Sequence, residues 1–127
     1  MMNEYHGIVI NLSQKDSSIF DGLDVIGERK ILLGLLVLRK IRVAPENLEE
    51  VIVHLQTNMR DRLWWIVRSF YFHFYRGNEL IIVFRKRTFR VTPDPSTWSE
   101  AVDYGRLLGI PEKQLNFFPC RLSDEEY

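Results

Sequence analysis

Residues 63–91 read LWWIVRSFYFHFYR, then Gly77-Asn78, then ELIIVFRKRTFRV. Two runs rich in aromatic and β-branched residues therefore flank a two-residue Gly-Asn connection. This arrangement is typical of an antiparallel β-hairpin with a tight turn. We expect the rest of the chain to be organised around this hairpin.

Side chains alternate between the two faces of a strand, so the turn position predicts which residues share a face. Placing the turn at Gly77-Asn78 pairs Tyr71 with Phe84. One face near the turn is then wholly apolar and is predicted to pack against helices. The opposite face is mixed, and it carries the candidate binding residues Trp65, Tyr71, His73, Tyr75, Phe84, Lys86 and Arg90.

The simple pairing has a flaw away from the turn. It places Arg68 opposite Arg87, and like charges directly across a strand pair are unfavourable. A β-bulge within residues 85–88 would relieve this contact and move every later side chain to the other face. The sequence therefore leaves open which face Arg85–Arg90 present.

Length and composition indicate one globular domain spanning residues 1–127. The 127 residues are 46% apolar and 27% charged, which is enough for a core and for a charged surface. No apolar run approaches the roughly 18 residues of a membrane span. The N-terminus lacks the features of a signal peptide, and the single cysteine, Cys120, allows no internal disulfide. We therefore expect a cytoplasmic protein.

The net charge is zero, but basic residues concentrate in residues 29–42 and 60–90. The flanking segments are acidic. This pattern predicts basic strands beside acidic helices and termini. The alternative is that mixed charges simply keep the surface soluble.

The N-terminal third combines a predicted strand, a turn-rich segment and an apolar run. Tyr5–Leu12 is predicted to be a strand. Residues 17–29 are rich in Gly and Asp and favour turns, although Asp21, Asp24 and Glu28 could instead form a metal or catalytic loop. Ile31–Leu38 fits either a buried helix or a strand, and the second half of residues 31–43 favours a strand.

The sequence also predicts two helices. Pro45–Met59 carries an apolar stripe at helical spacing, with His54 outside it. The second helix begins after Asp94, a good N-cap, and ends before Gly109. Its inner stripe includes Gly105, which would permit close packing. A last strand is expected at residues 115–118.

From residue 31 onward the predicted order is strand, helix, strand, strand, helix, strand. This is the ferredoxin-like βαββαβ pattern of the α+β class, with an antiparallel sheet and both helices on one face. The expected strand order is last, first, third, second. The Tyr5–Leu12 strand would be added at an edge, and the aromatic and basic face would be open.

An open face of this composition suggests three functions. The preferred one is a protein-interaction role, most simply a homodimer, because aromatic side chains and Arg favour interface centres. The second is binding of single-stranded RNA by stacking on Tyr71, His73 and Tyr75, although no RNP motif is present. The third is a small-ligand or enzymatic domain with His73 as general base. The alternative for this face is the less buried side of a core sheet, and no metal or cofactor site is predicted.

Overall fold

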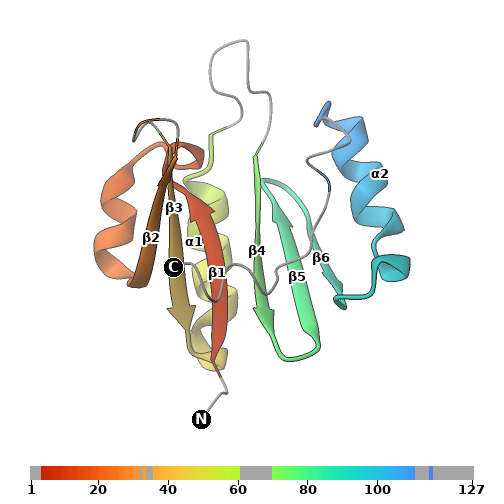
Figure 1. The fold of residues 1–127 in the computed structure, drawn as a ribbon, viewed down its shortest axis with the longest axis horizontal. Coiled ribbons are helices and arrows are strands. Elements are labelled where there is room, and N and C mark those ends of the chain that lie inside the picture. The colour runs from red at the N-terminus through yellow and green to blue at the C-terminus, as the bar shows by residue number, and fades with distance from the viewer. Residues whose placement is uncertain (1–3, 32, 34–35, 61–69, 111–114, 116–127) are drawn as a thin grey trace.

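The fold comes from a computed structural model that describes residues 4–31, 33, 36–60, 70–110 and 115 (Figure 1). The described residues form an α+β fold with one six-stranded antiparallel sheet and two α-helices. The strands are β1 (Tyr5–Ile10), β2 (Asp24–Ile31), β3 (Leu36–Val43), β4 (Tyr71–Arg76), β5 (Glu79–Phe84) and β6 (Thr88–Val91). The α-helices are α1 (Leu48–Thr57) and α2 (Ser99–Leu107). Short 3-10 helices are η1 (Asn11–Ser13), η2 (Ser17–Gly22), η3 (Pro45–Asn47) and η4 (Pro95–Thr97).

The strand order is β2-β3-β1-β4-β5-β6, so the expected strand order is wrong. The N-terminal strand is not an added edge. It pairs with β3 on one side and β4 on the other, which makes β3 and β4 parallel to each other without pairing. Helix α1 connects these two strands across one face. With β1 between them, the backbone N–H and C=O groups on the facing edges of β3 and β4 find hydrogen-bond partners. The same placement buries Val9 of β1 in the core.

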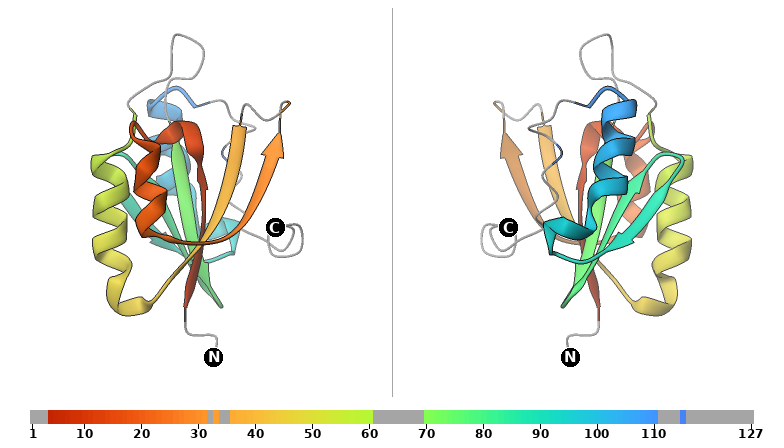
Figure 2. Two further views of the ribbon diagram at one scale, coloured as in Figure 1. Left: turned by 90° about the vertical axis from the view of Figure 1, so that its left-hand side faces the viewer. Right: turned by 90° about the vertical axis from the view of Figure 1, so that its right-hand side faces the viewer.

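The helices lie on opposite faces of the sheet, contrary to the one-sided arrangement that we expected (Figure 2). Helix α1 covers Phe72, Phe74, Ile81 and Val83. Helix α2 covers the other face of the β4–β6 region. All five residues of Leu80–Phe84 are buried, because β5 is covered from both sides.

The predicted hairpin is confirmed between Tyr71 and Phe84. The pairs run from Tyr71 with Phe84 to Arg76 with Glu79, and Gly77 adopts the left-handed conformation at φ 55°. No bulge follows. The amide of Phe84 donates to the carbonyl of Arg87 at 2.7 Å, and the chain reverses into β6, which pairs with the free edge of β5. The second arm is therefore two strands instead of one.

Two other predictions need correction. Residues 17–29 are not only turns, because they contain η2 and the first part of β2. Strand β2 lies at the edge of the sheet and has a bulge between Val25 and Gly27. Its sequence is rich in charged residues, as is common in edge strands, so it lacks the alternation of apolar and polar residues that predicts a half-buried strand. Ile31–Leu38 is neither one helix nor one strand, since it spans the end of β2, a turn at Leu33 and the start of β3.

Both predicted helices are confirmed, each preceded by a 3-10 turn. The α1 stripe buries Leu48, Ile52, Leu55 and Met59, and the carboxylate of Asp94 accepts from the Ser96 amide at 3.0 Å. Gly105 permits a close approach of Leu115, because a Cβ added there would lie 2.4 Å from the Leu115 side chain. The rest of the predicted last strand, residues 116–118, lies outside the described residues. Among the helices that the structure describes, none has the length and apolarity to cross a membrane.

Candidate interaction site

The face that we expected to be open is covered by α2. Phe84 is fully buried, and its ring lies 5.0 Å from that of Tyr104 on the helix. Tyr71 and Tyr75 pack against the same cluster, and burial raises the pKa of Tyr71 to about 12. Phe84 is therefore inaccessible to a partner, whereas Tyr71 and Tyr75 keep part of their surface exposed.

His73 lies on the same face of β4, opposite Ile8 and Ile82. The residue keeps part of its surface exposed, but its Nε2 is covered and has no hydrogen-bond partner in the described part of the chain. Burial lowers the pKa of His73 to about 4. A general base needs a substrate within hydrogen-bond reach of its nitrogen, and His73 lines neither of the two hollows described below.

The predicted basic residues do not join this face. Lys86 is exposed in the turn between β5 and β6, and Arg90 lies on the α1 side of the sheet, where it forms an ion pair with Glu49. Trp65 lies outside the described residues. The structure therefore keeps Tyr71, His73, Tyr75 and Phe84 on one face of the sheet and places Lys86 and Arg90 elsewhere.

The acidic residues Asp21, Asp24 and Glu28, which could have formed a metal or catalytic loop, make different contacts. Asp24 pairs with Arg42 at 2.8 Å, and Glu28 pairs with Arg39 at 3.2 Å. Asp21 and Glu28 line a hollow of about 490 Å³ on one side of η2, together with Arg39 and Phe20. The Arg39 guanidinium lies 4.6 Å from the Phe20 ring centre. No group of three or more potential metal ligands is present among the residues that could be described.

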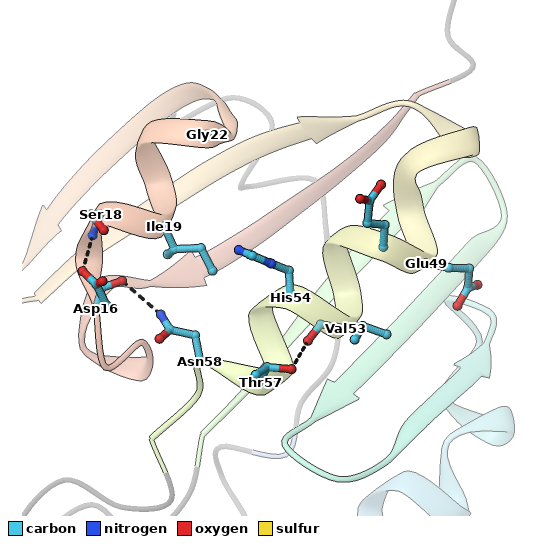
Figure 3. Close-up of a pocket in the computed structure, with 10 residues that line it drawn as sticks. Asp16, Ser18, Ile19, Gly22, Glu49, Val53, His54, Thr57 and Asn58 are labelled. Atoms are coloured by element: carbon cyan, nitrogen blue, oxygen red, sulfur yellow. Dashed lines mark hydrogen bonds between the residues drawn. The ribbon is translucent and has the colours of Figure 1, made fainter.

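A larger open groove of about 810 Å³ separates η2 from α1 (Figure 3). One wall is η2 with Ile19. The other is the outward stripe of α1, which carries Glu50, Val53, His54 and Thr57 at the spacing of one helical face. Figure 3 shows His54 projecting from α1 towards Ile19.

Hydrogen bonds fix one end of this groove. The carboxylate of Asp16 accepts from the Ser18 amide at 3.0 Å and so caps η2. The side chain of Asn58, just after α1, donates to the Asp16 carbonyl at 3.0 Å, while the Lys15 amide donates to the Asn58 carbonyl at 2.8 Å. These contacts hold the start of η2 against the end of α1, so the groove is built into the fold.

The groove is acidic and apolar. Three carboxylates line it, those of Asp16, Glu49 and Glu50, and its lining contains no Lys or Arg. Val53 is 58% exposed, and Ile19 packs against the core with part of its surface accessible. An exposed apolar surface beside like charges is suited to binding another molecule.

Sequence reasoning missed this groove because its walls are about 30 residues apart in the chain. One local signal was available. Val53 and His54 lie outside the buried stripe of α1, and an exposed Val beside acidic residues marks the outer face of the helix. No protein-family model, curated protein or solved structure matches the chain.

Proposed function

We propose that this chain is a protein-interaction module and that it binds its partner in the groove between η2 and α1. This keeps the expected class of function and moves it away from the sheet face, where α2 packs. The observation that carries the proposal is the exposed Val53 within an acidic groove whose two walls are tied together by hydrogen bonds.

The shape of the groove favours a peptide segment over a small molecule. A small-ligand site encloses most of its ligand and has a few convergent polar groups. This groove is open along α1, and its hydroxyl and amide groups already have partners. The Thr57 hydroxyl donates to the Val53 carbonyl at 2.8 Å, and the Asn58 amide donates to Gln14 at 3.2 Å.

Selection from a displayed library of random short peptides tests the proposal on the full chain. Val53→Gln removes the apolar surface of the groove, and Leu107→Gln is the matched control, because Leu107 is 80% exposed on the other helix. We expect enriched peptides that bind the wild type and Leu107→Gln equally and bind Val53→Gln about tenfold more weakly. Enriching no peptide, or only peptides indifferent to Val53→Gln, would refute the proposal.

A further inference from the structure

We infer that the partner segment is basic and amphipathic, with an apolar side chain seated between Ile19 and Val53 and a Lys or Arg beside Glu50. This inference rests on the proposed function and gives the partner a chemical class. It follows from which groups in the groove are already engaged and which remain available.

Two of the three carboxylates have partners within the chain. Glu49 forms an ion pair with Arg90, and Asp16 accepts the Ser18 amide at 3.0 Å. The carboxylate of Glu50 takes part in no ion pair or hydrogen bond in the described part of the chain, and neither does the ring of His54. Glu50 is therefore the charged group that a partner can engage without breaking a contact of the fold.

Glu50 also lies where a cation and an apolar group can be bound together. Val53 and His54 follow it by three and four positions on α1, so all three face the same side of the helix. Ile19 lies across the groove on η2. Because Ile19, Val53 and Glu50 line the same groove, one bound segment can offer an apolar side chain and a cation to them together.

The excess of negative charge in the groove favours a basic partner over a neutral or acidic one. Arg90 offsets the charge of Glu49, but Asp16 and Glu50 have no cationic partner in the described part of the chain, so the groove repels acidic segments and attracts basic ones. The net charge of the chain is zero, so this preference is a local property of the groove. Binding should therefore weaken as salt concentration rises.

The peptides selected for groove-dependent binding test the inference through their composition. We expect an excess of Lys and Arg around one or two apolar residues. Replacing those cations by Gln in a fluorescein-labelled synthetic copy should weaken binding about tenfold, and replacing them by Glu should abolish it. Fluorescence anisotropy at low and high salt measures each affinity.

Two matched variants identify the carboxylate. Glu50→Lys reverses the charge in the first turn of α1, and Glu100→Lys does the same in the first turn of α2, outside the groove. Both substitutions cost similar helix stability, since both place a cation near a helix N-terminus. We expect Glu50→Lys to weaken binding of the basic peptide about tenfold and Glu100→Lys to leave it unchanged.

The outcomes separate this inference from the proposed function. Groove-dependent peptides without excess Lys or Arg, or equal effects of Glu50→Lys and Glu100→Lys, would overturn the basic partner while leaving the groove as a binding site. Failure to select any groove-dependent peptide would overturn both. Light scattering that shows a dimer dissociated by Val53→Gln would identify a second copy as the occupant and would also overturn the inference.

Discussion

Protonation of His73 should make the stability of this protein fall in mild acid. Its ring is neutral in the folded state, because burial lowers its pKa from an ordinary 6.5 to about 4. The unfolded chain regains the ordinary pKa and therefore binds more protons between these two values. Stability is fully present above the unfolded pKa and declines as the pH falls towards the folded pKa.

The size of the effect follows from the two pKa values. Each unit of difference corresponds to about 1.4 kcal/mol, so the full loss is about 3 kcal/mol. About 2 kcal/mol of it should be lost between roughly pH 7 and pH 5. This is a large fraction of the roughly 5–15 kcal/mol that stabilises an ordinary domain.

His73→Leu is the variant that isolates this effect. Leucine is close to histidine in volume and cannot be protonated, and His73 makes no hydrogen bond to a described residue that the change would break. His54→Leu is the matched control, because His54 is exposed on α1. Differences between variants remove the contribution of carboxylates such as Glu79, which titrate at lower pH and are common to all three proteins.

Urea unfolding followed by tryptophan fluorescence gives the free energy of unfolding at each pH. We expect the wild type and His54→Leu to lose about 2 kcal/mol more than His73→Leu between pH 7 and pH 5. If His73→Leu loses as much stability as the wild type over this range, the buried imidazole is not the group responsible, and our account of this site is wrong.

Two further substitutions test packing and charge. A Cβ added at Gly7 would lie 2.5 Å from the Phe74 ring and would meet the neighbouring backbone, so Gly7→Ala should lower the free energy of unfolding by about 2 kcal/mol. Gly22→Ala, where nothing lies within 4 Å, should be nearly neutral, and equal urea midpoints for the two variants would contradict the close packing of β1 on β4. Burial and the hydrogen bond to Glu79, at 2.5 Å, raise the pKa of Tyr5. Glu79→Gln should therefore lower that pKa, measured by ultraviolet titration of phenolate against a Tyr5→Phe blank, and an unchanged titration would show that the carboxylate has no influence on the phenol.

Much of the local structure was predictable because short-range chemistry specifies it. Gly77-Asn78 supplies the left-handed turn, and the alternation around it predicts the pairing of β4 with β5. Asp94 and Pro95 begin η4, the 3-10 turn that precedes α2, and the apolar stripe of α1 identifies its buried side. Each of these features depends on residues a few positions apart.

The candidate site was not predictable in the same way. We expected the sheet face with Tyr71 and Phe84 to be exposed. No short sequence pattern shows on which face of the sheet α2 packs. One indication was present in Leu80–Phe84, where five consecutive apolar residues require burial on both faces of β5. A sheet with helices on one face only would have left half of that run exposed.

The amino-acid sequence by itself determined the Gly77-Asn78 turn, the pairing of β4 with β5 and the presence of the two helices, because steric limits and nearby hydrogen bonds act within a few residues. Only the tertiary structure decided that β1 lies between β3 and β4, that α2 covers the tyrosine face, and that η2 meets α1 to form a groove. These arrangements depend on which apolar surfaces, distant in the chain, are buried against each other. The hydrophobic effect is not directional, so each apolar surface could be buried against several others, and the choice is made only when the whole chain packs.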